Sequence, residues 1–292
     1  MSKKFRYNLV GQWFKGNTHL HSTASDGGKT FAELEELYAG GGYDFLFATD
    51  HNVTSRVATT RRDAPLIWFD GVELDGKDGT GAYYHVVCLG HVKGIEKGLP
   101  LEEGMRKARE QGALLILAHP FWSGNTFEDA RRWQFDGVEL YNHVCHWLNG
   151  KGDGLTYWNA VLQTYPTTLG IASDDAHLNS DYLGWHGGWI MVNARDRSRR
   201  AIMQAIRKGN FYASCGPEFH DISLKGDEVT IKTSPVQFAR LVGPKWGAAP
   251  RGDCGKRDLQ EATFKIPDYW EYAYVEIQDR QGRRAWTNTL LV

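Results

Sequence analysis

The sequence predicts an α/β protein in two parts, and three observations carry this prediction. Over residues 1–216, continuous apolar runs of strand length alternate with helical segments. Several of these runs end in His, Asp or Glu. From residue 217 on, the runs become short and alternating, with turns between them. Buried strands separated by helices favour a parallel sheet covered on both faces, either an α/β barrel or an open wound sheet.

The elements of the first part are predicted from caps and apolar runs. Thr30 begins a helix, Glu33 completes its capping box, and a glycine run from Gly40 ends it. Further helices are predicted at 100–112, 154–165 and 198–209. Strands are predicted at 43–51, 66–74, 83–90, 113–120, 135–142, 167–177 and 187–194.

Residues 217–292 are predicted to form a small, sandwich-like all-β module. The alternating runs "HDISL", "EVTIKT", "YAYVEIQD" and "AWTNTLLV" are strand candidates, and no helical pattern interrupts them. Turns are expected at Lys225-Gly226-Asp227 and Arg280-Gln281-Gly282. We therefore divide the chain into domains 1–216 and 217–292.

Composition restricts the classes of function. The 35 acidic and 34 basic residues nearly cancel, so the chain has no global basic field for nucleic acid. No apolar window reaches the length of a membrane span, and the N-terminal segment lacks the apolar core of a secretory signal. The four cysteines form no CxxC pair. We expect a cytoplasmic enzyme with free thiols and a small-molecule substrate; the sequence does not indicate its oligomeric state.

Histidines and carboxylates recur where the predicted strands end. Taken alone, an HxH pair is more often part of a polar loop than of a metal site. The carboxyl ends of parallel strands lie at one edge of the sheet, however, and histidines or carboxylates follow one predicted strand after another at this edge. Imidazole and carboxylate suit zinc, manganese or iron, and the set exceeds a single tetrahedral site. The candidate metal ligands, expected to hold two or three divalent ions, are His19, His21, Asp26, His51, Glu73, His85, His119, Asp175 and His177.

The ordered motifs "HLHSTASDG", "FATDH", "GVE", "AHP", "DGVELYN" and "SDDAH" resemble those of the polymerase and histidinol phosphatase (PHP) superfamily. The resemblance covers roughly residues 15–216 and implies a distorted seven-stranded β/α barrel. It also implies three groups of ligands, of which Glu73 belongs to two. These groups are His19, His21, Glu73 and Asp175; Glu73, His85 and His119; and Asp26, His51 and His177.

Variation within the superfamily affects two of these positions, and a third residue is expected to have a supporting role. Some members of the superfamily have a histidine where this chain has Asp26, and Asp26 also fits an ordinary turn. His91 is a nearby alternative to His85, because the segment between Glu and His varies among members. Asp50 is expected to orient a ligand histidine.

The stretches "WFKGNTHLHS", "RKGNFYASCGPEF" and "AYVEIQDRQGRRAWTNTLLV" resemble a branch of PHP metallohydrolases with a small C-terminal β-domain. This branch contains predicted phosphoesterases and is also similar to hydrolases of aryl carbamate esters, so the resemblance implies hydrolysis through metal-activated hydroxide without fixing the substrate. We expect a phosphoesterase that acts on a small phosphorylated molecule. Glu73, Asp175 and His177 are the expected catalytic residues. The alternative is a carboxyl or carbamate ester, or amide, hydrolase on the same metals, and a non-catalytic binding module is the third hypothesis.

Further residues are candidates for binding the substrate or donating a proton to it. An aromatic pocket with few basic residues would favour the ester hydrolase, whereas bound phosphate would favour the phosphoesterase. The aromatic segment 142–158 is a candidate pocket wall. Candidate phosphate-binding cations are Lys15, Arg56 and Arg195, and candidate proton donors are His143, His146 and His186, although each has a more ordinary surface role.

Overall fold

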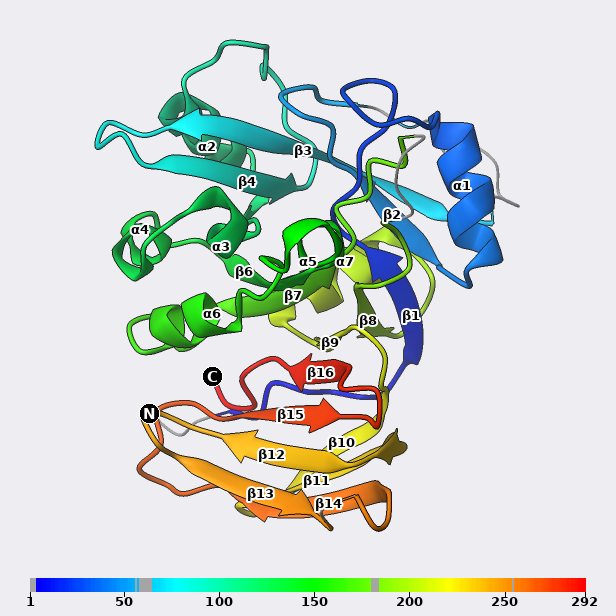
Figure 1. Ribbon diagram of the computed structural model, residues 1–292, viewed down its shortest axis with the longest axis vertical. Helices are drawn as coiled ribbons and strands as arrows, with labels where there is room; N and C mark the ends of the chain where they lie inside the picture. Colours follow the sequence, from blue (N-terminus) through cyan, green and yellow to red (C-terminus); the bar gives the residue numbers. More distant parts are fainter. Residues whose placement is uncertain (1–3, 56, 58–64, 180–183, 254) are drawn as a thin grey trace.

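The computed structural model describes residues 4–55, 57, 65–179, 184–253 and 255–292. Within these ranges the chain forms a mixed α/β structure with seven helices, a 13-stranded sheet and a separate three-stranded sheet (Figure 1). The α/β class expected from the sequence is therefore correct. None of the helices in the described ranges is long and apolar enough to cross a membrane.

The first part of the chain supplies seven neighbouring strands of the large sheet. These are β1 (Gln12–Asn17), β2 (Phe45–Ala48), β3 (Ile67–Lys77), β4 (Tyr83–Leu89), β5 (Leu114–Leu117), β6 (Gly137–Asn142) and β7 (Leu169–Ser173). Pairs β1–β2, β2–β3, β5–β6 and β6–β7 are parallel, but β3–β4 and β4–β5 are antiparallel. The expectation of a parallel sheet was thus only partly right. The connection from Asp78 to Ala82 is too short for the crossover that a parallel neighbour of β3 requires.

The chain beyond β1 meets the chain beyond β7. Leu20 forms a parallel bridge with Ala176. The amide of His21 donates to the carbonyl of Ala176 at 2.9 Å, and the amide of Asp175 donates to the carbonyl of His19 at the same distance. The two outer members of the seven-strand set are therefore joined at their carboxyl ends, and candidate ligands from both are brought side by side.

The helices confirm all four predicted helical segments and add three short ones. They are α1 (Phe31–Gly40), α2 (Leu101–Glu110), α3 (Pro120–Ser123), α4 (Phe127–Arg132), α5 (His143–Asn149), α6 (Leu155–Leu162) and α7 (Arg199–Lys208). Thr30 and Glu33 form the expected capping box of α1. Of the unpredicted helices, α3 begins three residues after the end of β5 and α5 begins directly after β6, at the edge where the candidate ligands lie.

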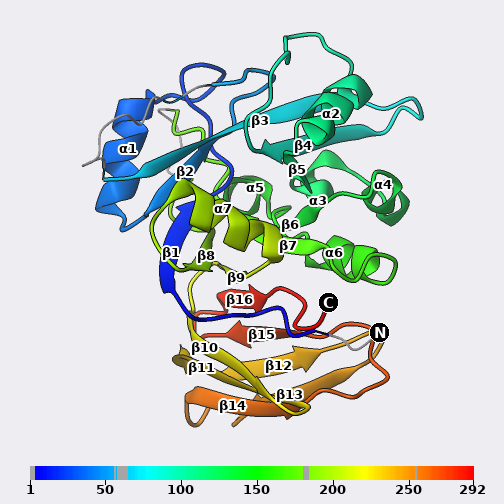
Figure 2. The ribbon, with the colours of Figure 1, turned by 180° about the vertical axis from the view of Figure 1, so that it is seen from behind.

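The large sheet continues into the C-terminal part. It runs from β1 through β8 (Trp189–Ala194), β9 (Phe211–Ser214), β16 (Arg284–Thr287), β15 (Tyr274–Gln278) and β12 (Phe238–Val242) to β13 (Ala248–Gly252). The smaller sheet contains β10 (Phe219–Lys225), β11 (Glu228–Val236) and β14 (Leu259–Lys265). The described residues after 217 contain strands and no helix, as expected. Figure 2 shows α7 in front of the strands and the C-terminal strands grouped below.

A buried apolar cluster lies directly beneath the candidate site. It includes Phe69 of β3, Val87 of β4 and Ile171 of β7. Side chains two or four residues further along an extended strand point to the same side. Glu73 and His85 therefore share the faces of Phe69 and Val87, so the apolar interior passes into a polar layer at one end of the strands.

Candidate metal centre

Glu73 is the centre of the candidate site. It lies in β3 and its side chain is only 1 % exposed. Its Oε1 atom is 2.8 Å from Nδ1 of His85 and 3.3 Å from Nε2 of His119. Its Oε2 atom is 3.1 Å from Nε2 of His19 and 3.2 Å from Nε2 of His21. Oε2 also lies 3.3 Å from Nδ1 of His51. The two carboxylate oxygens thus face different sets of histidine nitrogens, an arrangement that would let one carboxylate hold two ions.

Asp175 is the second buried carboxylate. Its Oδ1 atom lies 3.2 Å from Nε2 of His19 and 3.1 Å from Nε2 of His21, and Oδ2 lies 3.6 Å from Nε2 of His119. Asp175 adopts a left-handed backbone conformation with φ of 57°, which Asp tolerates better than most residues. The chain bends here directly after β7, and Asp175 faces the same histidine nitrogens as Glu73.

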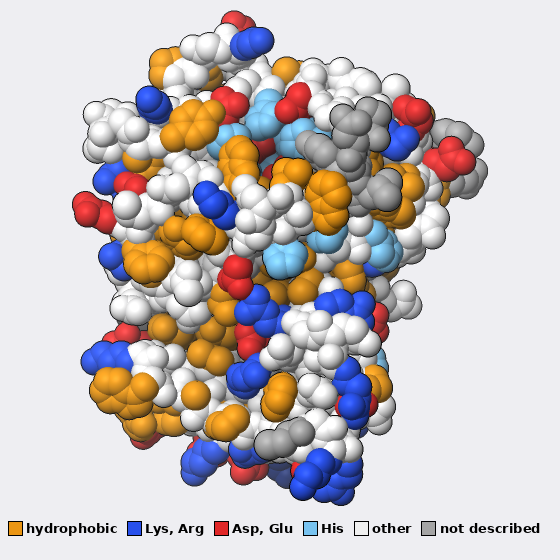
Figure 3. All heavy atoms as spheres, in the orientation of Figure 1, with side chains coloured by type: hydrophobic (Ala, Val, Ile, Leu, Met, Phe, Trp, Pro, Cys, Tyr) orange, Lys and Arg blue, Asp and Glu red, His pale blue; other side chains and the backbone are white. Residues whose placement is uncertain are grey.

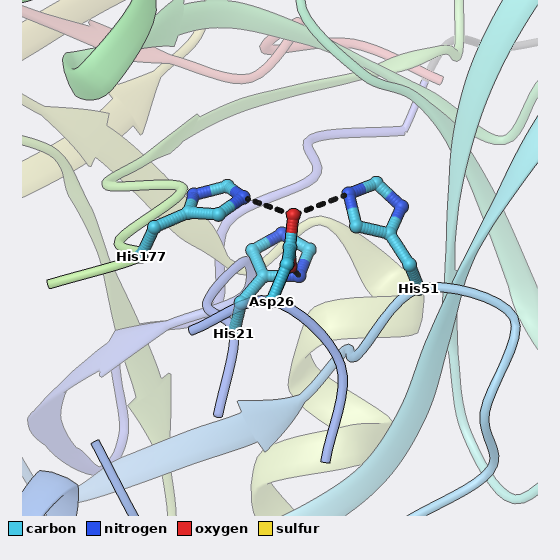
Figure 4. A group of neighbouring side chains, drawn as sticks. All are labelled: His21, Asp26, His51 and His177. Carbon is cyan, nitrogen blue, oxygen red and sulfur yellow. Dashed lines mark ion pairs between the residues drawn. The ribbon is translucent and has the colours of Figure 1, made fainter. Parts of the chain in front are cut away.

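Asp26 links a third group of histidines (Figure 4). Its Oδ2 atom is 3.3 Å from Nε2 of His177 and 3.8 Å from Nε2 of His51, with Asp26 between the two rings. Its Oδ1 atom is 3.6 Å from Nδ1 of His21. The side chain of Asp26 is 54 % exposed, whereas His21 is fully buried. This third group is therefore the outermost, on the solvent side of the cluster.

Asp50 does not orient a histidine, contrary to the expectation. Its carboxylate accepts hydrogen bonds from the amide and hydroxyl of Ser22 and from the hydroxyls of Ser25 and Ser55. Consecutive side chains of an extended chain point to opposite sides, so Asp50 is directed away from the face that His51 occupies. It fixes instead the loop that carries Asp26.

All nine candidate ligands lie in one cluster. Four groups place one possible ligand atom per residue within 4.8 Å of each other: His19, His21, Glu73 and Asp175; His21, Asp26, His51 and His177; His51, Glu73 and His85; and His19, His119 and Glu139. The first group is the one that the resemblance implies. The second adds His21 to the expected set. In the third, His51 stands where His119 was expected, although His119 remains 3.3 Å from Glu73.

Three buried atoms of the cluster lack a hydrogen-bond partner. They are Nδ1 of His21, Nδ1 of His51 and Oε2 of Glu73. Such atoms are costly when buried unsatisfied. Oε2 of Glu73 is nevertheless surrounded by ring nitrogens without a hydrogen bond, an arrangement in which a cation can satisfy several lone pairs at once. Neutral imidazoles and carboxylates are suitable ligands for such divalent ions, so the residues present fit a metal centre.

The carboxylates of the site are held in their charged form. Burial disfavours the charge of Glu73, but the nearby His19 and His85 keep the pKa of that carboxyl well below its ordinary value. Burial likewise opposes ionisation of Asp175, and His19 again lowers the pKa of Asp175. Both acids therefore remain able to bind a cation at neutral pH.

The pKa values of two histidines in the site are shifted in the opposite direction, upward. Burial disfavours the charge of His51, but the carboxylate of Glu73 raises the pKa of that histidine to about 9. Burial also opposes protonation of His177, yet its hydrogen bond with Asp26 raises the pKa of His177 to about 9. A bound metal must displace these protons, so its affinity is expected to fall as pH decreases.

Glu139 belongs to the site, and the sequence interpretation missed it. This residue of β6 is 1 % exposed. It accepts hydrogen bonds from Nδ1 of His19 at 2.8 Å, from the amide of His119 at 2.9 Å and from the hydroxyl of Ser173 at 2.6 Å. A signal existed: the pentapeptide DGVEL occurs at 70–74 and again at 136–140, with Glu73 and Glu139 as its acids.

His91 and two candidate cations lie outside the cluster. His91 pairs with Asp70 at 2.9 Å, so the structure places His85, and not His91, beside Glu73. The ammonium of Lys15 lies 4.3 Å and 4.0 Å from the ring centroids of Tyr43 and Trp189. The exposed Arg195 pairs with its neighbour Asp196. Arg56 lies outside the described residues.

The candidate proton donors also have other neighbours. Nδ1 of His143 is 3.2 Å from the hydroxyl of Tyr141, and the ring of His146 packs against the same tyrosine. The amide of His186 donates to the carboxylate of Asp174. None of these three histidines lines the cavity over the cluster, within the described residues.

A cavity of about 320 Å³ opens over the cluster. One wall is apolar, formed by Trp122 of α3 with Val144, Cys145 and Leu148 of α5. The ring of Trp122 meets the ring of His119 edge-on, with centroids 5.2 Å apart. No Lys or Arg is among the described residues that line the cavity. Figure 3 shows the histidines in a hollow with hydrophobic side chains beside it.

Comparison with known proteins gives a structural likeness only. No family model and no curated protein matches the chain. A two-domain protein from Bacteroides vulgatus with a predicted PHP-like metal-dependent phosphoesterase matches with a TM-score of 0.53 and 16 % identity, over 99 % of both chains. A candidate metal-dependent phosphoesterase from Bifidobacterium adolescentis matches with a TM-score of 0.47 and 12 % identity, over 66 % of this chain and 96 % of the other.

A third structure, an amidohydrolase from Chromobacterium violaceum with bound sulfate, has a TM-score of 0.39 and 14 % identity, over 67 % of this chain and 96 % of its own. The first likeness is the informative one because it spans both chains almost completely. The chain thus shares its overall fold with that two-domain protein.

Proposed function

We propose that this protein is a metal-dependent hydrolase of the PHP type, with two or three zinc, manganese or iron ions in the cluster. The observation that carries the proposal is the position of Glu73, whose two oxygens face different sets of histidines. Asp175 faces the same nitrogens, and the apolar interior lies below. Packing of the core does not explain such a dense, buried set of potential ligands, because unpaired polar atoms in a core lower the stability of the fold.

Bound divalent ions would supply two things: water of lowered pKa at neutral pH and positive charge for the transition state. The chain's own residues have separate tasks. Glu73 and Asp175 hold negative charge between the histidines, and Glu139 fixes the orientation of His19. Asp26 and His177 close the outer side. We assign the direct catalytic contacts to Glu73, Asp175 and His177.

The first candidate substrate is a small phosphate ester. A cluster of several cations can neutralise a phosphoryl group without help from Lys or Arg. The second candidate, a carboxyl or carbamate ester or an amide, is favoured by the apolar wall of Trp122, Val144 and Leu148. The lack of Lys and Arg among the described lining residues also favours an uncharged substrate.

A panel of substrates with one leaving group separates the two candidates. The protein, reconstituted with zinc, manganese or iron, is assayed on 4-nitrophenyl phosphate, the bis-ester, the acetate and the N-methylcarbamate. Because the leaving group is constant, the ranking of kcat/KM reports the group that is attacked. A metal-stripped sample and Glu73→Gln are the controls. No hydrolysis of any substrate at full metal loading would contradict the proposed function.

We also propose the finer architecture that the resemblance implies. Strands β1 to β7 form the distorted seven-stranded barrel, with the Leu20–Ala176 bridge as its closure. The division into domains at 216/217 places β10 to β16 in the smaller one. The pairing of β9 with β16 then joins the two domains through one sheet.

A further inference from the structure

A second polar site lies at Arg6, in the segment before β1. This segment runs antiparallel to the C-terminal residues, with Phe5 bridged to Leu291 (Figure 2). Arg6 is 8 % exposed, and its guanidinium donates to the carbonyl of Thr167 and the hydroxyl of Thr289. Its Nε atom is buried and has no hydrogen-bond partner.

No carboxylate is paired with Arg6 among the described residues. Burial lowers the pKa of its guanidinium only to about 10, so Arg6 remains charged at neutral pH. A buried charge with neutral partners alone is unfavourable. The negative end of the α7 dipole offsets part of this energetic cost, because the guanidinium packs against Gly209, just beyond the C-terminus of that helix.

Two cavities share Arg6. The larger, of about 680 Å³, is lined by four cationic side chains and, in the described part of the chain, by no acidic one. These cations are Lys4, Arg6, Arg195 and Lys208. The smaller cavity, of about 450 Å³, adds Arg207 and one acid, Asp136. The cavity over the metal cluster has the opposite character, since Lys and Arg are missing from its described lining.

We propose that the larger cavity is an anion-binding site, separate from the metal centre, that takes a phosphate group. Its ligand is inorganic phosphate or the phosphate of a small molecule. The buried guanidinium of Arg6 supplies a fixed positive charge in the lining, and Lys208 and Lys4 add further positive charge. Arginine is suited to this role because its planar donors match phosphate oxygens. The inference does not rest on the proposed function, because no residue is shared with the cluster.

The test is calorimetric titration of the metal-stripped, full-length protein with inorganic phosphate at constant ionic strength. The wild type and His19→Ala are expected to bind one phosphate per chain with equal affinity, which separates this site from the metal centre. Arg6→Gln and Lys208→Gln should each weaken binding about tenfold, because a charge-assisted hydrogen bond or contact is lost. The exposed Lys232→Gln, on β11, is the matched control and should bind as the wild type does.

Each outcome decides the proposal. Equal affinities for the wild type, Arg6→Gln and Lys208→Gln would overturn it, as would the absence of phosphate binding to the wild type. If Arg6→Gln does not fold, the exposed Lys208 variant decides alone. A parallel titration with glycerol phosphate distinguishes the two sources of the group: tighter binding of the ester than of free phosphate indicates a phosphorylated small molecule, and the reverse indicates phosphate itself.

Discussion

Glu139 accepts a hydrogen bond from Nδ1 of His19 across 2.8 Å, which leaves Nε2 of His19 directed at Glu73 and Asp175. Burial opposes ionisation of Glu139, but His19 lowers the pKa of Glu139, so this carboxylate is an acceptor only. The contact therefore selects the tautomer and the orientation of His19. Carboxylates that hold ligand histidines in this way tune metal affinity without touching the ion.

Glu139→Gln should therefore weaken metal binding roughly 10- to 100-fold, because the amide can present either a donor or an acceptor to His19. The measurement is a competition titration of zinc against a chelator of known affinity. Glu128→Gln, with a side chain 83 % exposed on α4, is the matched control. An unchanged zinc affinity in Glu139→Gln would show that His19 does not need this contact.

Asp26 should govern the outer ion alone. Asp26→Asn is expected to lower the metal content by one ion per chain while the ions around Glu73 stay, because only the outer group contains Asp26. Asp26→His should restore the lost ion, since imidazole suits the same metals. Elemental analysis after dialysis gives the ion count. Full occupancy in Asp26→Asn would mean that Asp26 is a turn residue and not a ligand.

Trp122 should contribute to substrate binding. Trp122→Ala is expected to raise KM for an aromatic ester roughly 3- to 10-fold, because an aromatic contact contributes about 0.5–1.5 kcal/mol. The value of kcat should change little. Trp147→Ala, which removes a half-exposed indole outside the described cavity lining, is the control. Equal KM values for the two variants would exclude Trp122 as a wall of the substrate site.

Asp78 should stabilise the fold in a pH-dependent manner. Burial disfavours its charge, but hydrogen bonds from Thr80 and Arg132 lower the pKa of Asp78 from 3.8 to about 2. Because the folded pKa is the lower one, this stabilisation is complete above pH 3.8 and is lost as pH falls toward about 2. The shift corresponds to about 2 kcal/mol.

Denaturant unfolding of Asp78→Asn measures this contribution. The loss of unfolding free energy should be about 2 kcal/mol at neutral pH, and it should shrink as the acid limb is entered. Asp227→Asn, which breaks an exposed pair with Lys265, should lose less than about 1 kcal/mol. A loss for Asp78→Asn that is small, or constant with pH, would contradict the assignment.

Much of the fold follows from local signals. The capping box of Thr30 and Glu33 and the uninterrupted apolar runs are sufficient to place α1 and the strands. The relative directions of the strands were harder to predict from the sequence, because they depend on the length of the segment that connects each pair of strands. The short link between β3 and β4 indicates a hairpin, but helices elsewhere favoured a uniformly parallel sheet.

The site could be predicted where the candidate ligand residues lie at the ends of predicted strands. His19, His21, Asp175 and His177 lie where two strand ends meet, which their spacing and position suggested. Asp50 was misassigned because adjacency in sequence places it on the opposite side from His51. Glu139 lies inside a strand as Glu73 does, and only the repeated pentapeptide marks it.

The metal content of the purified, reconstituted protein tests the central claim most directly. The claim is the proposal that the residues around Glu73 would hold at least two divalent ions. Elemental analysis of the wild type should give two or three ions per chain, whereas His19→Ala and Asp175→Ala should lose both metal and turnover. A folded wild-type protein that retains no zinc, manganese or iron, or variants that retain the full complement, would contradict the account.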